Sequence, residues 1–116
     1  MKSKFNVLGT EYTIVQGNGV MFPELTTMDG YTDTSTKTIV VDDMSDMKDQ
    51  DGAKKDLDNY KKQVIRHEII HAFLYECGLA ENSNETNAWA VNEEMVDWFA
   101  IQSPKIFATF DELDIL

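Results

Sequence analysis

The chain opens with a pattern that is typical of short β-strands. Apolar residues alternate with polar ones in two segments, at Phe5, Val7, Tyr12 and Ile14. Gly9 and the glycines of residues 17–19 interrupt this alternation, as turns between strands require. Residues 31–41 are rich in threonine, isoleucine and valine, which favour extended backbone. We therefore expect two or three short antiparallel strands, followed by a sheet strand over Thr38–Val41.

The middle of the chain changes to a helical pattern. We expect a helix from about residue 53 to residue 77, with Gly78 as its C-terminal stop. The first half of this segment is charged on most faces, whereas from Val64 onward it is apolar nearly all round. The second half of the helix is therefore expected to be buried, and any polar residue inside it needs a partner.

A second helix is predicted from about residue 84 to residue 102, where Ser103-Pro104 should end it. Residues 106–116 fit either a short helix or a packed tail. At 116 residues the chain suits a single domain, 1–116, with one cleft. The prediction is an α+β fold in which a small antiparallel N-terminal sheet packs on two helices.

The charge of the chain narrows the class of its partners. A formal charge of -11 and a pI near 4.4 disfavour binding to nucleic acid or to an anionic membrane, so we expect a protein or peptide partner. No apolar run reaches the eighteen or so residues that a membrane span needs, and the N-terminus does not read as a secretion signal. A cytoplasmic location is therefore expected, and the oligomeric state stays open.

Two other segments resemble functional sites, but a structural role is favoured for each. Cys77 is the only cysteine, which excludes an internal disulfide, and a small buried hydrophobic residue is the favoured reading over a catalytic thiol. The acidic stretch 42–51 has some of the spacing of an EF-hand calcium loop. Met47 stands where the first carboxylate of that loop belongs, so a solvated acidic loop with helix-capping aspartates is favoured.

The most specific motif is His67-Glu68-x-x-His71. Two histidines four residues apart lie on the same face of a helix, so both imidazoles can reach one metal ion. Glu68 is then beside the metal without being a ligand, as a general base acting on metal-bound water requires. A catalytic zinc usually takes three protein ligands, and the chain has no third histidine. The third ligand is therefore expected to be a carboxylate, which the segment 92–97 offers.

Glu93 and Asp97 are four residues apart and should project from the same side of the second helix. His67-Glu68-x-x-His71 followed by Asn92-Glu93-x-x-x-Asp97 resembles the gluzincin clan of zinc metallopeptidases. That resemblance implies one zinc per chain, with Glu93 as the third ligand and Asp97 as the carboxylate that orients His67. Glu94 points about 100° away from Glu93 around the helix and is the weaker candidate.

The segments 30–40 and 93–100 are similar to those of small phage- and prophage-encoded metallopeptidases related to the ImmA/IrrE family. The resemblance implies a minimal zincin that cuts a regulator in the host cytoplasm. Larger gluzincins have a downstream histidine or tyrosine that stabilises the oxyanion, and this chain has neither after Glu93. Tyr75 or Tyr31 is the candidate replacement. An edge strand at Thr38–Val41 would hold the peptide.

The alternative is a non-catalytic phage module, in which zinc only stabilises a protein-binding or regulatory domain. The presence of Glu68 argues against that alternative, because a purely structural zinc site has no use for the residue.

Overall fold

In the computed structural model, which describes residues 3–45, 55–80 and 92–116, the N-terminal alternation forms a hairpin. Strand β1 (Lys4–Val7) pairs antiparallel with β2 (Thr10–Gly17). Leu8 and Gly9 form the turn, and both have positive φ angles, of 50° and 96°. Two-residue turns of this kind match the twist of the strands, and glycine adopts them most readily.

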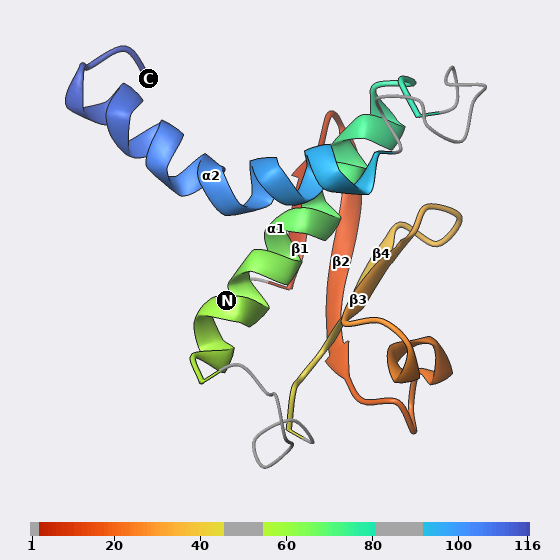
Figure 1. Cartoon of the computed structure of the whole chain (residues 1–116). Helices are drawn as coiled ribbons and strands as arrows, with labels where there is room; N and C mark the ends of the chain where they lie inside the picture. The colour runs from red at the N-terminus through yellow and green to blue at the C-terminus, as the bar shows by residue number, and fades with distance from the viewer. Residues whose placement is uncertain (1–2, 46–54, 81–91) are drawn as a thin grey trace.

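The remaining strands make the sheet mixed (Figure 1). Strand β3 (Gly30–Asp33) pairs antiparallel with β4 (Thr38–Asp42), and the strand order is β1-β2-β4-β3. Because β4 and not β3 lies next to β2, β2 and β4 run parallel. The α+β class is confirmed, but the prediction of a wholly antiparallel sheet is wrong in this pairing. Alternation of apolar and polar residues indicates that a segment is a strand, but it does not indicate which strand it pairs with in the sheet.

Strand Thr38–Asp42 is confirmed as a sheet strand, yet it lies inside the sheet and pairs on both sides. Its apolar residues Ile39, Val40 and Val41 are all buried. The prediction that this strand forms an edge is therefore wrong. Strand β3, which follows the 3-10 helix η1 (Pro23–Thr26), forms that edge of the sheet in the described residues.

Helix α1 (Leu57–Glu76) lies across one face of the sheet (Figure 1). It begins later than expected, at the N-cap Asp56, whose side chain accepts a hydrogen bond from Asn59 N at 3.1 Å. Most of the acidic stretch before it lies outside the described residues. Gly78 follows the helix with a φ of 85°, as a C-terminal stop requires.

Burial along α1 is one-sided, so the prediction that its whole second half is buried is wrong. The buried residues of the helix are Val64, Ile65, Glu68 and Ala72. Phe73 is 40% exposed, and Cys77 is exposed at the C-cap in place of the buried position expected for it. The sheet covers one side of α1 and the described part of α2 covers only part of the rest.

The C-terminal end of α1 is fixed to the sheet through Glu76. Its Oε1 accepts hydrogen bonds from the Tyr12 hydroxyl and from Lys37 Nζ, both at 2.8 Å. The ammonium of Lys37 and the Tyr12 hydroxyl hold the pKa of the Glu76 carboxyl below its usual value. These bonds fix the rotation of α1, because Tyr12 belongs to the buried core and cannot move with the helix.

Helix α2 (Glu93–Glu112) crosses α1 (Figure 1). The N-cap Asn92 accepts a hydrogen bond from Met95 N at 2.9 Å. The helix continues through Pro104, so the predicted stop at Ser103-Pro104 is wrong; residues 84–91 lie outside the described residues. Pro104 has no N–H for the carbonyl of Ala100, and Arg66 Nε donates to that carbonyl at 2.6 Å.

The C-terminal turns of α2 project away from the sheet, which leaves Phe107 and Phe110 partly exposed (Figure 1). Residues 106–112 are thus helical, where the sequence left two choices. Within the described ranges, neither helix has an apolar stretch long enough to cross a membrane.

Gly30 of strand β3 packs against Val64 and Glu68 of α1, and it provides a test of this packing. A Cβ added there would lie 2.9 Å from Val64 Cγ1 and 3.1 Å from the Val40 carbonyl oxygen. Gly30→Ala should lower the free energy of unfolding by about 1–3 kcal/mol, measured by urea denaturation, because the strand must move away from the helix. Val20→Ala, at a side chain that is 91% exposed, is the control and should change it by less than about 0.5 kcal/mol. Equal effects of the two substitutions would contradict the packing described here.

Candidate metal centre

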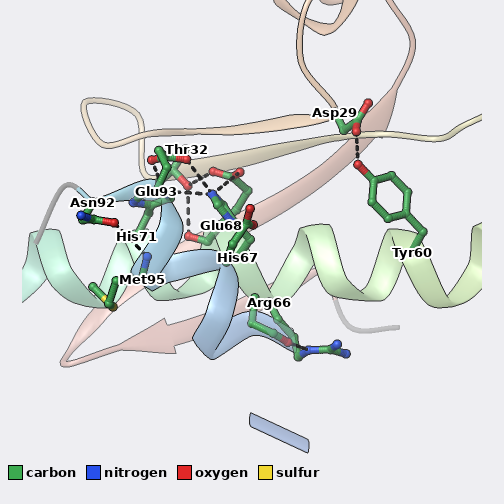
Figure 2. A network of polar contacts seen from close by, with 12 residues as sticks. Asp29, Thr32, Tyr60, Arg66, His67, Glu68, His71, Asn92, Glu93 and Met95 are labelled. Carbon is green, nitrogen blue, oxygen red and sulfur yellow. Dashed lines mark hydrogen bonds and ion pairs between the residues drawn. The ribbon is translucent and has the colours of Figure 1, made fainter. Parts of the chain in front are cut away.

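The two histidines of α1 bring their ring nitrogens together, one helical turn apart. His67 and His71 lie with ring centroids 4.8 Å apart, and their Nε2 atoms are separated by 3.1 Å (Figure 2). This is what a four-residue spacing on a helix predicts. Both rings are partly buried under the first turn of α2 and beside β3.

Glu93 approaches both rings from the first turn of α2. Its Oε1 lies 2.9 Å from His71 Nε2, and its Oε2 lies 3.1 Å from His67 Nε2. The three side chains offer ligand atoms that all lie within 4.8 Å of one another. The Glu93 side chain is 69% exposed, so nothing in the described residues encloses the cluster on that side.

Asp97 orients the first of these rings. Its Oδ1 lies 2.7 Å from His67 Nδ1, one helical turn beyond Glu93. An ionised carboxylate only accepts hydrogen bonds, so the proton of this contact lies on Nδ1. A neutral His67 then has an unprotonated Nε2, which directs its lone pair toward the Glu93 carboxylate and His71. Glu94 is exposed and does not line the site.

The donor atoms suit a zinc ion in type and in spacing. Two imidazole nitrogens and a carboxylate oxygen form an established set for hydrolytic zinc. Ligand atoms about 2.0–2.1 Å from a tetrahedral zinc ion lie about 3.3–3.4 Å from each other. The closest separations here are 2.9–3.1 Å. Without a shared cation or an added proton, a lone pair of His67 would face a carboxylate oxygen at that distance, which is unfavourable.

Glu68 is buried next to the histidines, and strand β3 holds it in place. The Thr32 hydroxyl lies 2.9 Å from Glu68 Oε1 and 3.1 Å from the backbone oxygen of Glu68, so its single proton is shared between two acceptors (Figure 2). The other carboxylate oxygen, Oε2, lies 3.9 Å from His67 Nε2. Burial raises the pKa of the Glu68 carboxyl, and the hydrogen bond from Thr32 opposes that rise. Sequence reasoning missed Thr32, because residues 31–38 contain several threonines and only the tertiary pairing selects one.

The two tyrosines considered as oxyanion donors lie on different walls of the site. Tyr75 is one turn beyond His71 on α1, with Lys37 Nζ 4.8 Å from its ring centroid. Tyr31 is on β3 and borders the same cavity, although strand alternation turns its side chain away from that of Thr32. Burial and the nearby Glu24 carboxylate raise the pKa of the Tyr31 hydroxyl.

The histidines, Glu68, Glu93 and Asp97 line one cavity of about 790 Å³, within the size range of small-molecule and peptide subsites. Strand β3 forms one wall and α1 forms another. Nearer the N-terminal end of α1, the Tyr60 hydroxyl donates a hydrogen bond to Asp29, and this bond joins α1 to the start of β3 (Figure 2). Burial and this contact raise the pKa of Tyr60.

The chain matches no protein-family model, and neither the curated proteins nor the solved structures include a match to it. The site is therefore characterised by its own donor atoms: within the described residues, His67, His71 and Glu93 could hold a metal ion, and the buried carboxylate of Glu68 lies beside them.

The donor set predicts one zinc per chain. Purified protein dialysed against zinc should contain about one equivalent by elemental analysis. His71→Ala should lose that metal, because it removes one of the three ligand atoms that the described residues bring together, and Cys77→Ser should keep it as a control. Full zinc content and affinity in His71→Ala would show that the ion binds elsewhere.

Asp97 should increase the zinc affinity of the site through its contact with His67. Asp97→Asn removes the carboxylate that fixes the tautomer and is expected to weaken zinc binding by about 10- to 100-fold in competition with a calibrated chelator. Glu94→Gln is the matched control on the same turn, with no expected effect on zinc. Unchanged affinity in Asp97→Asn, or a loss in Glu94→Gln, would contradict the placement of α2.

Proposed function

We propose that the protein is a zinc-dependent metallopeptidase that hydrolyses peptide bonds in a protein or peptide substrate. The observation that carries the proposal is the convergence of His67 Nε2, His71 Nε2 and a Glu93 carboxylate oxygen within 4.8 Å. Such a three-ligand set leaves a further position for water or substrate, which is typical of catalytic zinc.

The separation of Glu68 from the ligands supports catalysis over a purely structural site. Glu68 does not belong to the ligand cluster, yet it is only 7% exposed and is held by Thr32. Burying an ionisable group is costly, so a site that only locks two helices together would have no need of Glu68. The 69% exposure of Glu93 likewise fits an open site better than a closed structural one.

Zinc held by these ligands would supply Lewis-acid chemistry, in which water is acidified and a peptide carbonyl is polarised. Glu68 would take the proton from the attacking water at Oε2, the oxygen on the side of His67. The same carboxyl group would then give that proton to the amine nitrogen of the cleaved bond. The pKa of Glu68, raised by burial, makes the carboxylate a stronger base for this transfer. Asp97 would keep His67 in one tautomer throughout.

The proposed binding site for an extended substrate is the edge strand β3, and not Thr38–Val41, which lies inside the sheet. It lies at the edge of the described sheet, and Gly30, Tyr31 and Thr32 line the cavity. An extended peptide added to this edge would form main-chain hydrogen bonds along β3 and pass in front of Glu68. The contacts Asp29–Tyr60 and Thr32–Glu68 would keep the strand in place while the peptide binds.

Tyr75 is the better supported of the two oxyanion candidates. It lies on the histidine helix, one turn beyond His71, and it lines the cavity. Tyr31 also lines the cavity, but its hydroxyl is engaged by Glu24.

The resemblance of the two motifs to gluzincins and to small phage-encoded metallopeptidases extends the proposal to the substrate. A phage or host regulator in the cytoplasm is the proposed target, and the net charge of -11 favours a protein partner over nucleic acid.

Glu68→Gln separates chemistry from metal binding. The amide can still accept the hydrogen bond from Thr32 but cannot take a proton, so zinc affinity should be retained while cleavage falls by at least about 100-fold. A fluorogenic peptide library measures cleavage, and chelator competition measures the metal. Glu94→Gln serves as the carboxylate control. Wild-type cleavage rates in Glu68→Gln would exclude Glu68 as the base.

A further inference from the structure

The position of two site carboxylates depends on how α2 is held against α1. Among the elements of the described chain, α1 is the main packing partner of α2. The buried residues of α2 are Val96, Ala100 and Ser103, whereas the Glu93 and Asp97 side chains are 69% and 58% exposed. Neither carboxylate is enclosed, so each reaches the histidines only if the α2 backbone is correctly placed.

Within the described part of the chain, one hydrogen bond connects the backbone of α2 to a side chain of α1. A proline in α2 is the reason that this bond is needed. Pro104 lies in the interior of the helix and cannot donate an N–H to the carbonyl four residues before it, that of Ala100. Ala100 is fully buried, and a buried carbonyl without a donor is costly. Arg66 Nε donates to this oxygen at 2.6 Å, the short length of a charge-assisted bond (Figure 2).

This contact lies beside the metal centre in both helices. Arg66 precedes His67 in α1, and Ala100 follows Asp97 by one turn of α2. Glu93, Asp97 and Ala100 have the spacing of a single helix face, because successive members are four and then three positions apart. A shift of α2 at Ala100 would therefore move both carboxylates relative to the histidine rings.

We propose that Arg66 is a positioning residue for the metal centre, which places α2 by bonding the carbonyl that Pro104 leaves without its helical donor. This role rests on the proposed zinc site, although the contact that Arg66 makes is with the Ala100 carbonyl and not with a proposed ligand. Because proline is the reason the bond is needed, the two residues should depend on each other: restoring an N–H at position 104 should make Arg66 dispensable.

The test is a double-mutant cycle with Arg66→Ala, Pro104→Ala and the two combined. Arg66→Ala alone should weaken zinc binding by about 10-fold, measured by chelator competition. In the Pro104→Ala background the same change should weaken it by less than about threefold, because the new N–H serves the Ala100 carbonyl. Lys62→Ala removes a cation one turn earlier on α1 and should leave affinity unchanged. Equal losses in both backgrounds, or no loss in either, would overturn the proposal.

Folding and function are kept apart by two further measurements. If Arg66→Ala alone does not fold, the combined variant decides: near wild-type zinc affinity supports the proposal, and a weak or unfolded combined variant contradicts it. The cycle is repeated on metal-free protein as melting temperatures, where Arg66→Ala should cost roughly 5 °C or more in the wild-type background and less with Pro104→Ala. Should the wild-type protein take up no zinc, the proposed function fails. The melting temperatures of the metal-free variants then test the positioning role alone. Equal shifts in melting temperature in the wild-type and Pro104→Ala backgrounds would contradict that role.

Discussion

The hydrogen bond between His67 Nδ1 and Asp97 Oδ1 is the interaction on which the rest of the site depends. At 2.7 Å it joins the two helices and assigns the ring proton to Nδ1, which directs the lone pair of Nε2 toward Glu93 and His71. If Asp97 lay elsewhere, the two nitrogens and the carboxylate would have no common orientation. Where α1 and α2 meet, this bond therefore gives the candidate ligand atoms of the two helices a common orientation.

The fold supports this arrangement because α1 lies between the sheet and α2, which contribute different residues to the site. On one side the sheet holds the helix through buried residues and through Glu76, and Thr32 of β3 donates a hydrogen bond to Glu68. On the other side α2 supplies the remaining carboxylates and leaves them partly open to solvent. Buried polar groups must be paired, and the partners here come from outside α1: Thr32 of β3 bonds Glu68, and the carboxylates of α2 contact His67 and His71.

The parts of the site that follow from helical periodicity could be predicted from the sequence. The shared face of His67 and His71, and that of Glu93 and Asp97, are local properties of spacing, and the structure has both. The pairing of β4 with β2, the bond from Thr32 to Glu68 and the exposure of Cys77 depend on tertiary packing. The continuation of α2 past Pro104 was missed for the same reason, because the compensating donor is Arg66 on another helix.

The most direct test of the central claim is X-ray absorption spectroscopy at the zinc edge on protein loaded with one equivalent of zinc. The ligand set described here predicts two imidazoles and one or two further oxygen atoms at about 2.0–2.2 Å, with no sulfur, and a loss of one imidazole in His71→Ala. A zinc–sulfur distance of about 2.3 Å would assign the ion to Cys77 and contradict the account. So would a spectrum without imidazole scattering, which would place the metal among the acidic residues of the surface.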